Sequence, residues 1–293
     1  MIQLDRRAIL AASAALLSPR TVRAQDRAAA SAEAVRKLKV RFAVNAEIWW
    51  GGLPFEQRIE RSLAAGFERI EFWPWRNKDL AALEKLSKDR GVKFAQFTAW
   101  GFDPGLCNPA NHQKAVDEVR EACKAANRIQ CPMMTVVAGN DQKGMTREQM
   151  HAHVTTGLKL LAPVARDHNI TLILEPMNGR VDHPGHCLYG SEAAVRICRE
   201  VDSPHVKINW DLYHMQLAEG DLCGRLKDGL DQLAYVQVAD TPGRNEPGTG
   251  EIFYPRVFRA LDELGYKGVV GLECWPKDGE ERAIERLIAA ATW

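Results

Sequence analysis

The stretch ITLILEPMN at residues 170–178 is a run of apolar side chains that ends in a carboxylate, Glu175, and a turn. The run has no polar face, which predicts a strand that is buried on both sides. A segment with helical spacing follows at residues 191–200, and the next apolar run, VKINW at 206–210, again leads into an acid, Asp211. A buried strand, a helix and a second buried strand together form the repeating unit of a parallel sheet.

The same alternation of strand and helix runs through the chain from residue 40 onward. Strands are expected at residues 41–46, 68–73, 92–98, 133–138, 170–175, 206–210, 234–239 and 268–273. Helices are expected at 55–65, 78–90, 112–127, 147–168, 191–200, 222–231, 255–264 and 279–291. Eight such units in about 250 residues predict an α/β protein with one (β/α)8 barrel, the TIM barrel, as a single domain over residues 40–293. A doubly wound open sheet is the alternative, but no GxGxxG motif follows the first strand.

The N-terminal segment has a different composition. Two arginines at residues 6–7 precede a short apolar run at 8–17, and VRA at 22–24 offers small residues where a signal peptidase cuts. This pattern predicts a cleavable twin-arginine signal peptide over residues 1–24 and a linker over 25–39. The twin-arginine export machinery is therefore an expected partner, and the expected location is the periplasm. The apolar run of about ten residues is too short for a stable membrane anchor.

The composition is that of a globular protein without a polyanionic partner. Of 293 residues 46% are apolar, and 39 Lys and Arg nearly balance 38 Asp and Glu, which gives a net charge of +1. This balance gives no electrostatic reason to expect nucleic acid or an anionic membrane as a partner. The seven cysteines have no CxxC spacing and are expected to be core thiols, although export would permit a disulfide. The sequence leaves open whether the chain forms a homo-oligomer.

Four consecutive strands of the predicted barrel carry an oxygen-bearing side chain at or near their ends: Glu175, Asp211, Gln237 and Glu273. The active site of such a barrel forms at the C-terminal ends of its strands, so we expect these side chains to converge. Three carboxylates at one buried point repel one another and raise each other's pKa, and a divalent cation removes this repulsion. An all-oxygen ligand set favours Mn²⁺, Mg²⁺ or Co²⁺, and we predict that these four residues bind such an ion.

Further polar and aromatic residues lie just beyond the predicted strands. His214 follows the sixth strand, where it can bind a substrate oxygen, and Arg244 lies in the loop after the seventh, where it can pair with a carboxylate. Glu251 ends the same turn-rich loop and is expected to orient Arg244 or a ligand. Trp49 and Trp75 follow the first two strands and are expected to form a substrate-binding wall that excludes water and stacks on a sugar.

These motifs resemble those of the hydroxypyruvate isomerase family, within the wider xylose isomerase-like barrels that include the ketose 3-epimerases. The matching segments are LEPMN (174–178), DLYHMQ (211–216), VQVAD (236–240), PGRNEPGTGE (242–251) and GLE (271–273). The resemblance implies that Glu175, Asp211, Gln237 and Glu273 bind the metal, and that Glu175 and Glu273 are the catalytic acid–base pair. The ketose 3-epimerases have His where this chain has Gln237, so the hydroxypyruvate isomerases are the better match.

The expected activity is a metal-dependent isomerisation in carbohydrate metabolism, with a small hydroxy-carbonyl acid or sugar as the partner. One glutamate removes a proton beside the carbonyl and the other returns it, through an enediolate that the metal stabilises. Hydroxypyruvate and tartronate semialdehyde are the first expected pair. A ketose 3-epimerase or free-sugar isomerase is the first alternative, favoured by the aromatic wall and the export signal. A barrel that only binds a sugar is the second alternative, and it leaves the paired carboxylates without a role.

Overall fold

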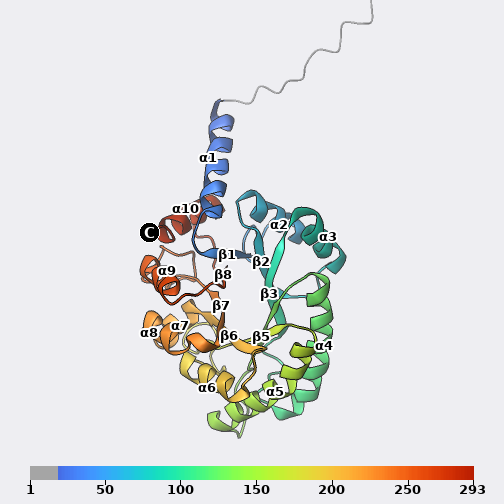
Figure 1. Cartoon of the computed structure of the whole chain (residues 1–293). Helices are drawn as coiled ribbons and strands as arrows, with labels where there is room; N and C mark the ends of the chain where they lie inside the picture. The colour runs from blue at the N-terminus through green and yellow to red at the C-terminus, as the bar shows by residue number, and fades with distance from the viewer. Residues whose placement is uncertain (1–18) are drawn as a thin grey trace, which may run out of the picture.

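Eight parallel strands close into a barrel in the order β1 to β8, with β8 paired to β1 (Figure 1). The structure, a computed structural model, describes residues 19–293. The strands are β1 (Arg41–Asn45), β2 (Arg69–Pro74), β3 (Lys93–Trp100), β4 (Met133–Val137), β5 (Thr171–Glu175), β6 (Val206–Asp211), β7 (Leu233–Gln237) and β8 (Val269–Leu272). The predicted (β/α)8 barrel is confirmed, and each strand lies close to its predicted range.

Helices surround the barrel and follow the strands. In the described part of the chain they are α1 (Pro19–Arg36), α2 (Phe55–Ala64), α3 (Leu80–Arg90), α4 (His112–Arg128), α5 (Arg147–Asp167), α6 (Ser191–Val201), α7 (Leu212–Ala218), α8 (Leu222–Asp228), α9 (Tyr254–Glu263) and α10 (Glu280–Ala290). Two short 3-10 segments, η1 (Pro109–Asn111) and η2 (Leu230–Gln232), precede α4 and β7. Within residues 19–293 no helix combines the length and the apolar character that crossing a bilayer requires.

Helix α7 is not among the helices that the sequence predicts, and it begins directly after β6. Asp211 is the residue that caps it, because its Oδ1 atom accepts a hydrogen bond from the backbone N–H of Tyr213 at 2.8 Å. An acid at this position therefore ends a strand and starts a helix at the same time. This leaves the second oxygen of Asp211 free to face the barrel mouth.

The barrel interior is only partly apolar. One small apolar cluster there consists of Ala43, Ala95, Ile173 and Tyr235. The pairing register places Asn45, Glu71 and Gln96 side by side on β1, β2 and β3. It also places Asp211 beside Gln237 on β6 and β7. Buried polar residues therefore form a layer across the barrel beneath the C-terminal ends of the strands.

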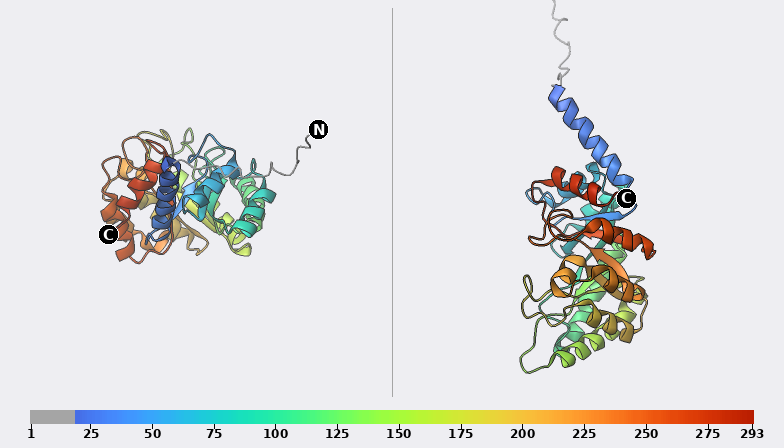
Figure 2. Two further views of the ribbon diagram at one scale, coloured as in Figure 1. Left: turned by 90° about the horizontal axis from the view of Figure 1, so that it is seen from above. Right: turned by 90° about the vertical axis from the view of Figure 1, so that its left-hand side faces the viewer.

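Helix α1 is the clearest departure from the sequence predictions. It runs through most of the segment 25–39 that the sequence predicts to be a linker. Its C-terminal part packs on the barrel, where Ala32 is buried and Arg27 pairs with Glu285 of α10, while its other end stands out from the barrel (Figure 2). The linker prediction is thus corrected, because an alanine-rich segment favours a helix. The signal peptide predicted over residues 1–24 falls mostly outside the described residues and stays a prediction.

The cysteines behave as the sequence predicts. All seven are free thiols, and only Cys223 among them is not fully buried. The buried cysteines pack as small apolar side chains, a role that requires no particular spacing between them in the sequence.

Candidate active site

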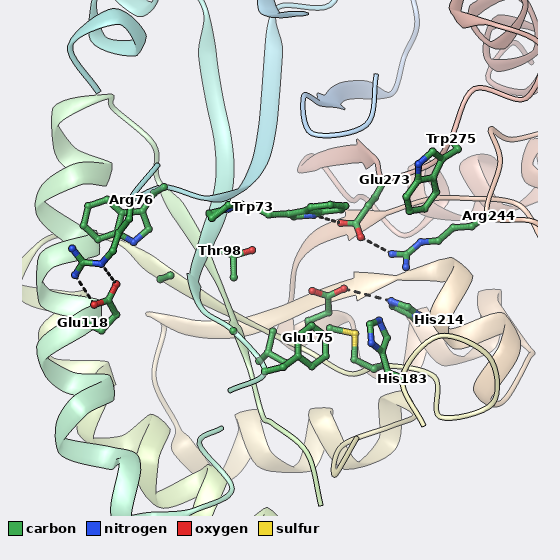
Figure 3. A pocket seen from close by; sticks show the side chains of 17 residues that line it. Trp73, Arg76, Thr98, Glu118, Glu175, His183, His214, Arg244, Glu273 and Trp275 are labelled. Atoms are coloured by element: carbon green, nitrogen blue, oxygen red, sulfur yellow. Dashed lines mark hydrogen bonds and ion pairs between the residues drawn. The ribbon is translucent and has the colours of Figure 1, made fainter. Parts of the chain in front are cut away.

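The loops at the C-terminal ends of the strands surround a cavity of about 690 Å³ (Figure 3). Four side chains that can ionise or donate line one end of it: Glu175, His214, Arg244 and Glu273. Four aromatic side chains contribute to its walls: Trp73, Trp75, Phe102 and Trp275. The cavity therefore combines a compact polar end with an extensive apolar lining.

Three carboxylates converge at the polar end. Glu175 and Asp211 are the last residues of β5 and β6, and Glu273 directly follows β8. All three are buried, and burial is the main cause that raises the pKa of each carboxyl above its ordinary value. The pKa of Glu273 rises to about 8, and at Glu175 repulsion from Glu273 and Asp211 adds to the effect of burial. The structure thus brings these three predicted site residues together.

Arg244 offsets part of this negative charge. Its Nη2 atom donates to Oε1 of Glu273 at 2.5 Å and to Oδ2 of Asp211 at 3.2 Å. Among the described residues it is the one arginine or lysine within ion-pair distance of any of the three carboxylates, and it pairs with two of them, Asp211 and Glu273. One guanidinium against three buried carboxylates leaves a deficit of positive charge, which a bound cation would remove.

The loop over residues 240–252 holds Arg244 in this position. Asp240 is fully buried and its carboxylate accepts hydrogen bonds from backbone N–H groups along the loop. Glu246 is also fully buried and pairs with Arg286 of α10 at 2.5 Å. Arg244 itself has a φ of +53°, a left-handed conformation that costs free energy for any residue except glycine. The loop therefore keeps a strained backbone that directs Arg244 at the acids.

Hydrogen bonds determine where His214 carries its proton. The Oδ1 atom of Asn178 accepts from two backbone N–H groups, so its amide nitrogen is the group that donates to Nδ1 of His214, at 2.6 Å. The neutral ring then carries its proton on Nε2, which lies 3.5 Å from Asp211 and 3.9 Å from Glu175. Burial, with Arg244 nearby, lowers the pKa of His214 well below its ordinary value, so the ring stays neutral. A neutral donor at this place suits the substrate-binding role that the sequence predicts.

Gln237 lies beneath the carboxylates rather than among them. Its Oε1 atom accepts from Asn209 at 2.5 Å, and its Nε2 atom donates to Glu273 at 2.5 Å and to Glu71 at 3.2 Å. Side chains from β1, β3 and β7 also donate to Glu71, which is fully buried. Glu71 is not among the predicted site residues, although an acid inside the apolar strand RIEFWP was a signal for it. In this arrangement Gln237 orients Glu273 through its amide nitrogen.

The donor set fits a hard divalent cation. One ligand atom each of Glu175, Asp211 and His214 lie within 4.8 Å of one another, as a single ion would require. Because His214 carries its proton on Nε2, the two carboxylates are the better ligands of the three. Glu273 lies next to them and is bonded to Arg244. Of the four predicted ligands, Gln237 is the one whose oxygen faces away from this group, because Asn209 occupies it.

Two residues predicted to bind substrate lie away from the cavity. Trp49 is fully buried, and its indole N–H donates to the carbonyl oxygen of Leu272 at 3.2 Å, so it is a core residue. Glu251 is exposed and accepts from Gln216 at 3.3 Å instead of contacting Arg244. Both follow strands in sequence, as predicted, but packing turns their side chains elsewhere. Trp75 does line the cavity.

Among the cavity residues outside the predicted site are Trp73, Phe102 and His183. Trp73 donates through its indole N–H to Oε2 of Glu273 at 3.3 Å. Phe102 stacks on His183 with ring centroids 4.7 Å apart. Their sequence signal is weak, because an aromatic residue near the end of a strand is more often part of the core.

Fold and site together define a TIM barrel with three buried carboxylates at the polar end of its cavity. The model of the family described as "Xylose isomerase-like TIM barrel" matches residues 59–291, and the chain belongs to this family. The chain is 31% identical to hydroxypyruvate isomerase of Escherichia coli (strain K12) over 251 residues, which covers 84% of this chain and 97% of that protein. It is 30% identical to 2-oxo-tetronate isomerase of Cupriavidus necator over 246 residues, 82% of this chain and 94% of that protein.

A solved structure shares the fold over the same region. The crystal structure of AP endonuclease, family 2, from Brucella melitensis superposes with a TM-score of 0.79 at 27% identity, and covers 84% of this chain and 96% of that one. The two curated relatives, which are themselves named isomerases, confirm the resemblance to the hydroxypyruvate isomerase family.

Proposed function

We propose that the protein is a metal-dependent isomerase of hydroxy-carbonyl substrates, with hydroxypyruvate and tartronate semialdehyde as the first pair to test. A proton leaves the hydroxyl-bearing carbon beside the carbonyl and is added to the carbonyl carbon, while the hydroxyl proton passes to the former carbonyl oxygen. The observation that carries this proposal is the pair of buried glutamates that face one another across the cavity, Glu175 and Glu273 (Figure 3). The relatives named hydroxypyruvate isomerase and 2-oxo-tetronate isomerase support the same class of reaction.

Glu273 is the group best suited to take the first proton. Its carboxylate form is stabilised by three donors: Arg244, Gln237 and Trp73. Its pKa of about 8, raised by burial, lies close enough to neutrality for a carboxylate to act as a general base. The electron pair of the broken C–H bond moves toward the carbonyl carbon, and negative charge develops on the carbonyl oxygen as the enediolate forms.

Donors at the polar end can bind that developing charge. The guanidinium of Arg244 and the Nε2–H group of His214 both line the cavity beside the glutamates. Preorganised donors of this kind stabilise an oxyanion without reorganising during the reaction. Glu175 faces Glu273 in the cavity (Figure 3), so this residue is placed to deliver a proton to the former carbonyl carbon.

Asp211 and Glu175, with Glu273 beside them, are the residues that would hold a divalent cation of the Mn²⁺, Mg²⁺ or Co²⁺ type. When bound, such an ion supplies Lewis-acid polarisation of the carbonyl oxygen and neutralises the excess carboxylate charge. The charge deficit at the site is the reason to expect it: three carboxylates meet a single arginine.

Epimerisation is the second candidate, because the two glutamates lie on facing walls. If the proton returns to the same carbon from the opposite side, a ketose would be epimerised instead of isomerised. The product distinguishes the two reactions.

We also propose that the protein is exported to the periplasm by the twin-arginine machinery. The support is the sequence alone: the arginine pair at residues 6–7 and the short apolar run at 8–17. Replacing both arginines with lysine is expected to retain the protein in the cytoplasm, which cell fractionation with an antibody would detect. Unchanged export of the lysine variant would contradict the proposal.

Deuterium exchange tests the proposed reaction directly. The protein, loaded with Mg²⁺ or Mn²⁺, would be incubated with hydroxypyruvate and with a panel of ketoses in D₂O, and deuterium uptake measured by mass spectrometry. We expect uptake at a carbon beside the carbonyl, lost after chelation and restored by the metal. No uptake with any substrate would overturn the proposed chemistry.

A further inference from the structure

The cavity extends well beyond the acid–base end. Its volume of about 690 Å³ is room for roughly twenty water molecules at about 30 Å³ each. Pockets of this size bind ligands much larger than a three-carbon acid. Figure 3 shows Glu273 and Arg244 at one end, Arg76 and Glu118 at the other, and Trp73 between them. The reacting groups therefore occupy only one part of the available space.

The far end of the cavity is formed by three side chains that contact one another, Trp75, Arg76 and Glu118, which we call the outer subsite. All three residues line the cavity. Arg76 binds Glu118 through two parallel hydrogen bonds, Nε to Oε1 at 2.8 Å and Nη2 to Oε2 at 2.5 Å. The guanidinium lies 4.4 Å from the ring centroid of Trp75. The indole is thereby held in place by a cation that is itself held by a carboxylate.

The chemistry of the outer subsite matches a sugar ring. The guanidinium of Arg76 covers one face of the Trp75 indole, so the C–H face of a pyranose would stack on the other, apolar face. The Arg76–Glu118 pair is partly exposed and offers donors and acceptors at the edge of that surface, where the hydroxyl groups of a sugar lie. The pair is neutral as a whole, so it calls for an uncharged polar ligand instead of an anion.

We propose that the substrate is a ketose that carries a second sugar ring, a keto-disaccharide, whose second ring binds the outer subsite. This inference rests on the proposed function for the reacting end, where the hydroxy-carbonyl group would meet Glu175 and Glu273. The reaction is unchanged, since protons move only between the reacting carbons and their oxygens and the glycosidic bond stays intact. Binding energy from the remote ring would be used to position the reacting carbons, so a substrate without that ring reacts more slowly.

A matched pair of substrates tests this inference. Fructose and maltulose present the same ketose, and maltulose carries an additional glucose ring. Deuterium exchange in D₂O would be measured for both with the full chain loaded with metal. We expect kcat/KM for maltulose to exceed that for fructose by about tenfold or more, a difference that the remote ring supplies.

Variants of the outer subsite locate the effect. Trp75→Ala and Glu118→Gln are each expected to lower kcat/KM for maltulose by about tenfold more than they lower kcat/KM for fructose. Phe253→Ala is the matched control, because Phe253 is 72% exposed and does not line the cavity. This control variant should leave kcat/KM unchanged for both sugars. Thermal unfolding would verify that all three variants are folded.

The outcomes separate this inference from the proposed function. Two results would overturn the outer subsite and leave the proposed reaction standing. In the first, fructose or hydroxypyruvate exchanges deuterium, but kcat/KM for maltulose does not exceed that for fructose. In the second, Trp75→Ala lowers kcat/KM for both sugars by the same factor. Maltulose binding would also be measured by tryptophan fluorescence without turnover. If maltulose binds in a way that depends on Trp75 while no substrate exchanges deuterium, the reaction is overturned and the subsite stands.

Discussion

The two halves of the barrel contribute different chemistry to one cavity. The half formed by β5 to β8 contributes the ionisable groups, with Glu175, Asp211 and Glu273 at strand ends and Arg244 in a loop. The half formed by β1 to β4 contributes aromatic and surface groups, above all Trp73 in β2, Trp75 just after it and Phe102 after β3. The motifs that carry the family resemblance lie in the first of these halves. Under the proposed function, the strands β5 to β8 would carry the reacting groups, and side chains from β2 and β3 would select the substrate.

Removing either glutamate should have the largest effect. Glu175→Gln and Glu273→Gln keep the side-chain shape but remove the acid–base group, so we expect kcat to fall by about 10²- to 10⁴-fold with every substrate. Steady-state rates and deuterium exchange would measure this. Glu251→Gln is the control, because Glu251 is an exposed acid of the same barrel face that contacts neither glutamate. Near-normal activity of either glutamate variant would contradict the assignment.

Arg244→Lys should have the next largest effect. Lysine keeps the positive charge but cannot bond Glu273 and Asp211 with the same planar group, and we expect kcat/KM to fall by about 10²-fold. The loss should be similar for small and large substrates, because Arg244 belongs to the reacting end. A loss confined to large substrates would show that the division between the two halves is wrong.

The pKa of Glu273 predicts how stability depends on pH in metal-free protein. The folded-state pKa of about 8 lies above the ordinary 4.5, so the folded protein binds more protons than the unfolded chain between these values. The free energy of unfolding should therefore fall as pH rises from about 5 to 8, by a total of a few kcal/mol at most. Melting temperatures over this range would show a smaller fall for Glu273→Gln, and an equal fall would contradict the prediction. Added Mg²⁺ should also reduce the fall in the melting temperature of the wild-type protein between pH 5 and 8.

Trp73→Phe should have the smallest effect and tests the hydrogen bond by which the aromatic wall contacts Glu273. The substitution removes the indole donor to Glu273, a hydrogen bond that lowers the pKa of this carboxyl. The acid limb of the kcat–pH profile should move to higher pH, with a loss of about tenfold or less in kcat. Trp50→Phe is the control, since Trp50 does not line the cavity. An unchanged pH profile would show that Trp73 only shapes the wall.

Local signals were sufficient to predict the barrel. Each strand is a short apolar run such as VKINW, each is followed by a segment with helical spacing, and eight repetitions leave few alternatives. Segment 25–39 shows where local signals were misread, because its alanines favour the helix α1 that packs on α10. The acids Glu175, Asp211 and Glu273 were also predictable from local sequence, since a carboxylate at the end of a buried strand is unusual.

Side-chain direction and long-range contacts were decided only by the tertiary structure. Trp49 and Trp75 both follow strands, yet one is packed into the core and the other lines the cavity. Glu71 and Gln237 are far apart in sequence, and their hydrogen bond exists only because closing the barrel brings β2 and β7 together across its interior. The positions of the strands and helices, and of the acidic residues at the strand ends, could be predicted because they depend on neighbouring residues along the chain. Which side chains meet in the cavity depended on packing between distant segments, which no local pattern encodes.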